Sequence, residues 1–185
     1  MGEIIPLPGS GEGLGHRHET PPAVDPQDTD GAAAMAQHLL AISDRSRDEL
    51  RRRLLRGGYA PETAAEALDR LEARGWVDDG RLAEELTRRR LSHGYGRRRV
   101  LADLAARGVD PQTVSRTGEA LAAGQAAAVR VAAERLRRSH RGPPDAAEVI
   151  RLAGALQRRG FDSSDIRSVL REMASEVTLP PDDGE

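Results

Sequence analysis

The chain has 185 residues and a formal net charge of -2, and it contains neither cysteine nor lysine. The lack of cysteine excludes disulfides and thiolate metal sites, and it fits a reducing compartment such as the cytoplasm. No apolar run is long enough to span a bilayer, and the N-terminus lacks the pattern of a signal peptide. We therefore expect a cytoplasmic chain, without a membrane partner, that holds one domain or a short repeat array.

The small net charge hides a strong asymmetry along the chain. Residues 1–31 carry one arginine against six acidic residues, and residues 172–185 carry five acidic residues and no base. Residues 32–171 therefore hold the other 27 arginines against 19 acidic residues, a net charge of +8. A basic body with acidic ends suggests a polyanionic partner, although solvated helix faces and flexible tails explain the charges about equally well.

The two ends and the body differ in pattern as well as in charge. Residues 1–31 lack apolar periodicity and are rich in glycine, proline and acids, which predicts a disordered tail, and residues 176–185 form a second acidic tail. Between them, apolar residues recur at helical spacing and are interrupted by glycine and proline. In chain order the predicted helices cover residues 32–43, 46–56, 61–74, 78–92, 97–107, 110–122, 125–139, 145–159 and 162–174.

Three glycines reveal an internal repeat, because Gly58, Gly108 and Gly160 are separated by 50 and 52 residues. Apolar residues occupy five equivalent positions around each glycine: Leu50, Val100 and Leu152; Leu54, Leu104 and Leu156; Tyr59, Val109 and Phe161; Ala64, Val114 and Ile166; Leu71, Leu121 and Met173. Self-similarity at one period predicts an all-α fold of three tandem three-helix repeats in an elongated array. We assign residues 32–74, 75–122 and 123–175 to repeats one, two and three.

No catalytic or metal site is evident in the sequence. Asp78 and Asp79 are adjacent, so on a helix their side chains diverge by about 100°, and helix capping explains them better than acid–base catalysis. The five histidines are scattered without the spacing of metal ligands. The glycines before Arg97 follow no predicted strand, which argues against a phosphate-cradling loop. We predict a protein that is not an enzyme and needs no metal or cofactor.

Arginine triplets are the candidates for partner binding. In the triplet that follows Gly96, both the guanidinium groups and the backbone N–H groups of a helix start are suited to phosphate. The candidates are Arg51, Arg52, Arg53, Arg88, Arg89, Arg90, Arg97, Arg98 and Arg99. Aromatic residues are too few for base stacking to drive binding, so we expect weak, sequence-independent contact with a nucleic acid backbone. Exposed arginines contribute little to stability, so replacing the last triplet is expected to leave the fold intact.

Four segments together resemble the RecX family of bacterial regulatory proteins. They are R-S-R-D-E-L-R-R-R-L (45–54), G-W-V-D-D-G-R-L-A (75–83), G-Y-G-R-R-R-V-L-A-D-L-A-A-R-G-V (94–109) and L-Q-R-R-G-F (156–161). The residues that carry the motif are Gly75, Asp79, Arg81, Gly94, Gly96, Leu104 and Gly108. The resemblance implies a curved, elongated monomer that binds RecA recombinase filaments and usually inhibits RecA ATPase, strand exchange and co-protease activity. The long acidic N-terminal tail, and Leu82 where the family usually has an aromatic residue, depart from the pattern.

Two other functions remain open on the residues alone. Short helices joined by glycine turns can form a sequence-specific helix-turn-helix protein, or a helical-repeat adaptor for an unrelated protein partner. The helix over 97–107 lacks the amide side chains common in base readers, which disfavours the first alternative. The basic body favours a filament regulator over a helical-repeat adaptor.

The motif around residues 75–81 also predicts how repeats one and two meet. We expect Asp79 and Arg81 to act as a helix-start cap and its partner, and to hold the first repeat against the second. We expect Trp76 to fill the core at this junction, with anchoring of a partner as its alternative use.

Overall fold

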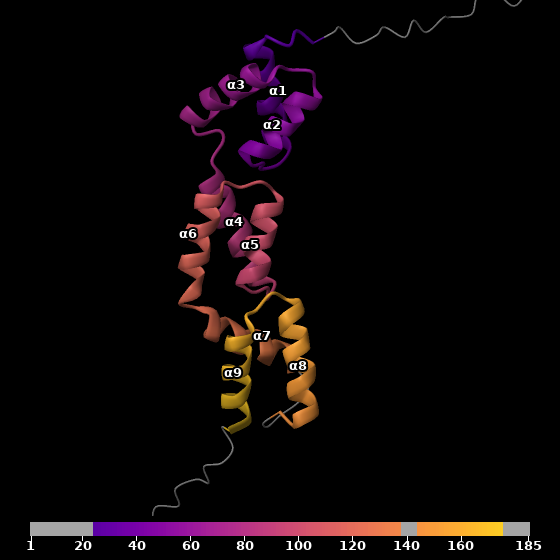
Figure 1. Ribbon diagram of the computed structural model, residues 1–185, viewed down its shortest axis with the longest axis vertical. Coiled ribbons are helices and arrows are strands. Elements are labelled where there is room, and N and C mark those ends of the chain that lie inside the picture. The colour runs from indigo at the N-terminus through magenta and orange to yellow at the C-terminus, as the bar shows by residue number, and fades with distance from the viewer. Residues whose placement is uncertain (1–23, 138–143, 176–185) are drawn as a thin grey trace, which may run out of the picture.

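The computed structural model describes residues 24–137 and 144–175, and all regular secondary structure within them is helical. The order is α1 (Thr29–Ile42), α2 (Arg47–Arg56), α3 (Pro61–Ala73), α4 (Asp79–Ser92), α5 (Arg97–Ala106), α6 (Pro111–Ala122), α7 (Gln125–Arg137), α8 (Ala146–Arg158) and α9 (Ser163–Ser175). Figure 1 shows these helices following one another in groups along one long axis. The predicted all-α repeat array is confirmed, and none of the described helices is long and apolar enough to cross a membrane.

The first helix begins earlier than the sequence suggested. Asp28 is its N-cap and accepts a hydrogen bond from the Gly31 backbone N–H at 2.8 Å, so residues 29–31 are helical and do not belong to the predicted tail. The capping chemistry of aspartate explains this start. Most of the predicted N-terminal tail, the predicted C-terminal tail at 176–185 and the predicted helical residues 138–139 lie outside the described residues.

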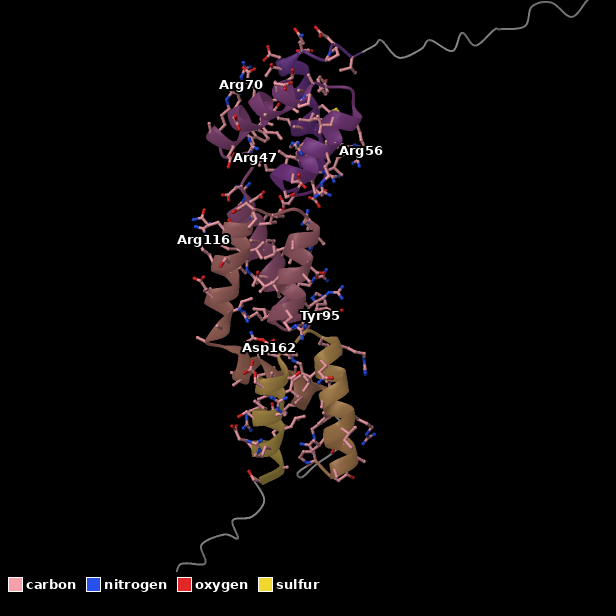
Figure 2. All side chains as sticks on the ribbon, viewed as in Figure 1. Arg47, Arg56, Arg70, Tyr95, Arg116 and Asp162 are labelled. Carbon is pink, nitrogen blue, oxygen red and sulfur yellow. The ribbon has the colours of Figure 1, made fainter. Side chains whose placement is uncertain are left out.

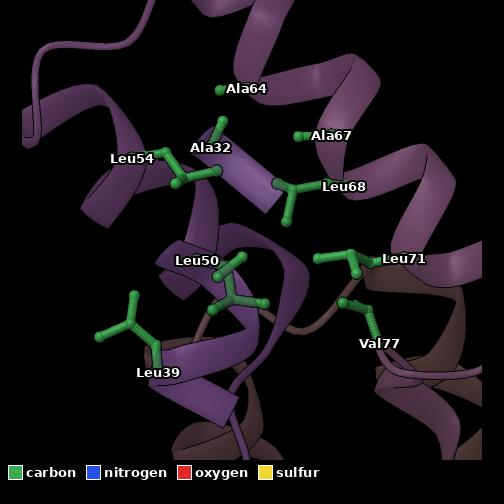
Figure 3. Close-up of a cluster of buried hydrophobic side chains, with 10 residues drawn as sticks. Ala32, Leu39, Leu50, Leu54, Ala64, Ala67, Leu68, Leu71 and Val77 are labelled. Atoms are coloured by element: carbon green, nitrogen blue, oxygen red, sulfur yellow. The ribbon is translucent and has the colours of Figure 1, made fainter. Parts of the chain in front are cut away.

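Each repeat has its own hydrophobic core. Of the fifteen apolar residues aligned on the three glycines, twelve are buried, and the other three, Tyr59, Val114 and Leu121, are half-buried against the same cores. Figure 3 shows the core of repeat one, where Leu50 and Leu54 of α2 meet Leu68 and Leu71 of α3. The periodic apolar positions therefore form three separate clusters, as expected of stacked units.

The core of repeat one corrects one detail of the sequence interpretation. Alanines at 32 and 36 are the fully buried residues of α1, whereas Ile42 is 66% exposed. At the start of the next repeat Val77 is 2% exposed and joins this core, whereas Trp76 is 50% exposed. The prediction that Trp76 fills the core was therefore wrong, because the smaller neighbour takes the inward position after Gly75.

The three aligned glycines end the second helix of each repeat in the same way. Their φ angles are +96°, +71° and +83° for Gly58, Gly108 and Gly160, a left-handed conformation that favours glycine. In all three repeats the backbone N–H of the next residue donates to a leucine carbonyl five residues earlier, at 3.2 Å. This bond turns Tyr59, Val109 and Phe161 back toward the core, which explains the apolar residue after each glycine.

The second helices α2, α5 and α8 stack end to end. At the first junction the Ser46 hydroxyl donates to the Arg107 carbonyl at 2.5 Å, joining the start of α2 to the end of α5. At the second junction the Gly96 N–H donates to the Arg159 carbonyl at 2.8 Å, joining the start of α5 to the end of α8. Ser46 and Gly96 each precede their repeat glycine by twelve residues, and Arg107 and Arg159 by one. The same positions therefore make both junctions.

The second junction depends on a close approach of two backbones. The Arg98 N–H also donates to the Gly160 carbonyl, at 2.9 Å. A Cβ atom placed on Gly96 would lie 2.6 Å from the same oxygen. Glycine at 96 is therefore required by the packing of repeat two against repeat three.

Replacing Gly96 with alanine tests this junction. Because the added methyl group collides with backbone atoms, we expect Gly96→Ala to lower the free energy of unfolding by about 1–3 kcal/mol. Urea unfolding followed by circular dichroism measures the change, and Gly124→Ala is the control because nothing lies within 4 Å of a Cβ there. Equal stability of the two variants would contradict the proposed packing role.

Candidate functional site

The three stacked second helices each carry a net positive charge, as α4 and α7 also do. The helix α2 has five arginines and two acidic residues, α5 has three arginines and one acidic residue, and α8 has two arginines and one acidic residue. By contrast, α3 has one arginine and four acidic residues. Because the second helices stack end to end, their exposed arginines follow one another along the array. We call this set the basic column: Arg51, Arg52, Arg53, Arg56, Arg98, Arg99, Arg151 and Arg158. Figure 2 shows Arg56 at the outer edge of α2.

Several of the predicted arginines have acidic partners on their own helix. Arg52 donates through Nε to Asp48 at 2.6 Å, and Arg51 lies 3.8 Å from the same carboxylate. Arg88 pairs with Glu85 one turn earlier on α4. Such exposed pairs contribute only about 0.2–1 kcal/mol, so they leave these arginines able to exchange partners.

Two more of the predicted arginines belong to one cluster around Tyr95. Arg90 and Arg99 both pair with Asp103, with Nε–Oδ distances of 2.6 and 3.1 Å. Their guanidinium groups also lie 5.6 and 5.7 Å from the centre of the Tyr95 ring, within cation–π range. These two side chains therefore link α4 to α5 within repeat two.

Arg97 has a structural role that the sequence did not reveal. Its Nε donates to the Gly118 carbonyl at 2.8 Å, and its Nη1 lies 3.7 Å from Asp162, just before α9. Tyr95 and Asp162 mark this meeting of repeats two and three in Figure 2. The backbone N–H of Gly96 and of Arg98 donate to α8, as described above. The start of α5 is therefore occupied by protein, and the prediction that its backbone binds phosphate was wrong.

The remaining predicted arginines have side chains without a partner among the described residues. They are Arg53 on α2, Arg89 on α4 and Arg98 on α5, and all three are exposed. Sequence reasoning missed Arg45 and Arg56, which line one groove along α2 with Arg52 and Arg53. Positions 49, 52 and 56 share one face of α2 and Arg45 lies just before its Ser46 cap, a signal that inspection of triplets overlooks.

Asp79 and Arg81 of the motif lie near the first junction, with roles that differ from those predicted. Asp78, not Asp79, caps α4 and accepts from the Arg81 N–H at 2.9 Å. Asp79 accepts from the N–H of Arg47 at 2.9 Å and of Asp110 at 3.4 Å, and so ties α4 to the starts of α2 and α6. Asp79 does join repeats one and two, but through backbone groups rather than through Arg81. Burial raises the pKa of Asp79, against the effect of these hydrogen bonds.

The Arg81 side chain is exposed at a groove between α4 and α6. This groove measures about 560 Å³ and combines Arg81 and Arg116 with Asp78, Glu84 and three threonines. Its charges are balanced, and nowhere in the described parts of the chain do three or more histidine, cysteine, aspartate or glutamate residues form a possible metal site.

An ion pair completes the first junction. Arg107 donates to both carboxylate oxygens of Glu49, at 3.0 and 2.9 Å, and to the Asp44 carbonyl at 2.7 Å. Glu49 also accepts from the Ser46 N–H at 3.0 Å, which completes the predicted capping box. Burial raises the pKa of Glu49, but the hydrogen bonds from Arg107 and Ser46 outweigh it, so the pKa lies below its usual value.

The fold and the basic column define a class of protein, an array of three three-helix repeats with arginines along its second helices. Three family models match the chain: the first three-helix domain of RecX over residues 32–71, the second over 78–117 and the third over 124–170. The chain belongs to the RecX family.

Relatives of known name and solved structures agree with this assignment. The regulatory protein RecX of Xanthomonas axonopodis pv. citri is 38% identical over 135 residues, which cover 72% of this chain and 82% of that protein. The regulatory protein RecX of Stenotrophomonas maltophilia is 36% identical over 133 residues, covering 72% and 81%. The crystal structure of RecX from Lactobacillus salivarius shares the fold, with a TM-score of 0.69 at 19% identity over 79% of this chain and 96% of that one.

The Glu49–Arg107 pair leads to a prediction with a defined pH dependence. A carboxylate whose pKa is lowered by folding stabilises the protein above its unfolded pKa, and this contribution is lost as the pH falls through the folded pKa. We expect Glu49→Gln to lower the free energy of unfolding by about 1–2 kcal/mol at neutral pH. The difference from the parent protein should shrink as the pH falls below the ordinary glutamate value of 4.5.

Urea unfolding at neutral and acidic pH measures this difference. Glu134→Gln serves as the control, because Glu134 is exposed on α7. A loss of stability for Glu49→Gln that stays the same at both pH values would show that the pair is not what stabilises the junction.

Neighbouring arginines at the start of α5 give a second test. Arg97→Ala removes the bonds to Gly118 and Asp162, and we expect it to destabilise the protein by about 1–2 kcal/mol. Arg98→Ala removes an exposed side chain and should change stability by less than about 0.5 kcal/mol. Thermal unfolding of the two variants decides the point, and equal melting temperatures would restore the original expectation that the whole triplet is a surface feature.

Proposed function

We propose that this protein binds RecA nucleoprotein filaments and lowers the ATPase, strand-exchange and co-protease activities of RecA during DNA repair and the SOS response. It acts as a monomer in the cytoplasm, without catalysis of its own. Membership of the RecX family supports this role, since the resemblance noted in the sequence implies RecA as partner. The single structural observation that carries it is the basic column on an elongated array (Figure 1).

The shape and charge of the array suit a filament. Its repeats follow one another along one axis, so the arginines of the basic column can meet a line of anionic groups on a helical polymer. Arginine contacts with phosphate are largely indifferent to base sequence and weaken with salt. The nucleic acid contact is therefore a supporting interaction, and RecA supplies the specificity.

The helix-turn-helix alternative finds less support in the geometry. In such proteins the first residues of the recognition helix contact base edges in the major groove. In α5 this end is packed against Arg159 and Gly160 of repeat three, and Arg97 is bonded to Gly118 and Asp162. A reader of specific bases would have to use another helix.

RecA ATPase on single-stranded DNA tests the proposal. We expect substoichiometric amounts of this protein to lower the ATPase rate, because one elongated molecule contacts several filament subunits. A triple variant, Arg53→Ala, Arg56→Ala and Arg98→Ala, should retain its melting temperature, because these exposed arginines contribute little to stability. It should need roughly ten times more protein for the same inhibition, and its slope of log affinity against log salt should fall by about two or three.

The control for the double variant Arg53→Ala and Arg98→Ala is the double variant Arg167→Ala and Arg171→Ala, which removes the same exposed charge from α9 and not from the basic column. An ATPase rate unchanged at saturating protein would sink the proposal and favour an adaptor for another partner. An equal loss of RecA inhibition in both sets of variants would indicate that the contact surface does not lie on the basic column.

A further inference from the structure

Two grooves at the junction of repeats one and two share Arg45 in their walls. The first, of about 240 Å³, runs along α2 and is lined by Arg45, Glu49, Arg52, Arg53 and Arg56. The second, of about 160 Å³, includes Leu40, Trp76 and Arg81 together with Arg45. A basic groove and an aromatic one therefore meet at a single side chain.

The α2 groove has positive charge that no acid among the described residues neutralises. Both oxygens of Glu49, its acid, accept hydrogen bonds from Arg107. Arg53 and Arg56 form no ion pair with any residue that the structure describes. Arg45 lies near enough to Glu49 to help lower the pKa of that carboxyl, yet its Nε is buried without a hydrogen-bond acceptor among the described residues. Because Arg45 also lines the groove, an anion there lies beside its guanidinium group.

The adjoining groove presents an exposed aromatic ring. Trp76 is the one tryptophan of the chain and is 50% exposed. It also lines a neighbouring groove of about 260 Å³ with Arg74 and Arg81, so arginines lie around it. Indole rings beside arginines are typical of sites on which single-stranded bases stack.

We propose that this junction binds single-stranded nucleic acid, with phosphates on Arg45, Arg53 and Arg56 and one base stacked on Trp76. The acids divide the two parts of the site. Asp44, Asp78 and Glu85 lie in the Trp76 groove and disfavour a phosphate there, whereas the one acid in the α2 groove, Glu49, is paired with Arg107. A duplex keeps its bases stacked internally, so only a single strand offers one to the indole. An acidic protein segment would pair with the arginines but would offer no base to stack on the Trp76 indole.

This inference deepens the proposed nucleic acid contact, and it changes one expectation from the sequence. Aromatic residues are too few for stacking along a whole strand, but one exposed indole suffices for one base. The site needs no RecA, so it is tested on the full-length protein alone.

The single tryptophan makes the experiment direct. The protein is titrated with a deoxythymidylate oligomer of about 12 nucleotides, and with an abasic oligomer of the same length, while tryptophan fluorescence is recorded. We expect saturable quenching by the first oligomer. The abasic oligomer should bind roughly ten times more weakly, because stacking is lost while the phosphates remain.

Variants separate the two parts of the site. Trp76→Leu should reduce binding of the base-bearing oligomer to the abasic level, as measured by anisotropy of labelled oligomers, and Trp76→Phe should restore part of the preference. Arg45→Ala and Arg53→Ala should weaken binding of both oligomers and lower the salt slope by about one each. Arg167→Ala is the control of equal charge change. Arg53 is exposed, so its variant keeps the test valid even if Arg45→Ala fails to fold.

Three results would overturn the proposal. These are equal affinity for the two oligomers, unchanged Trp76 fluorescence at saturation, and an equal effect of Arg45→Ala, Arg53→Ala and Arg167→Ala. Quenching and full competition by polyglutamate would also overturn it, in favour of an acidic protein segment. If RecA is inhibited but no oligomer binds, this site is refuted and the proposed function stands. If oligomers bind at Trp76 but RecA is unaffected, the proposed function is refuted and this site stands.

Discussion

The array depends on the contact between the end of one second helix and the start of another. A repeat of three short helices buries few residues, so neighbouring repeats must also satisfy the backbone groups left free at helix ends. Here the start of α2 meets the end of α5, and the start of α5 meets the end of α8, through equivalent residues. The partial positive charge of each helix start thereby lies on the partial negative charge of the next helix end. The three helix dipoles align, and the arginines on these helices become one column.

The same contact decides which charges are available to a partner. At the first junction it needs Arg107 for Glu49, and at the second it needs Arg97 for Gly118 and Asp162. Half-buried arginines with fixed partners hold repeats together, whereas exposed arginines on the outer face of the same helices remain available. Runs of arginine in this chain therefore have two functions at once, and membership of a triplet does not tell them apart. The burial of each arginine and its hydrogen-bond partners distinguish the two functions.

Much of the fold could be predicted from sequence because it repeats locally. Glycine with positive φ, an apolar residue after it and leucines four and eight residues before it define a helix end and its buried face without knowledge of other repeats. The junction could not be predicted in the same way. Val77 rather than Trp76 enters the core built by the helices of repeat one, and Asp79 is taken up by backbone N–H groups at the starts of α2 and α6, which leaves Asp78 to cap α4. Those groups come from distant parts of the chain, so no local pattern encodes them.

The third repeat shows how the stack ends. The helix α8 begins three residues earlier than the alignment with α2 and α5 requires, at Ala146. The position that matches Ser46 and Gly96 is Glu148, which therefore lies inside the helix, 7% exposed and paired with Arg137 at 3.3 Å. Asp145 caps the extra turn and accepts from the Glu148 N–H at 2.7 Å. Because Asp145 accepts a hydrogen bond from a backbone N–H at the start of α8, this start lacks the contact that the starts of α2 and α5 make with a neighbouring helix end. The different start of α8 limits the basic column to the length of three helices.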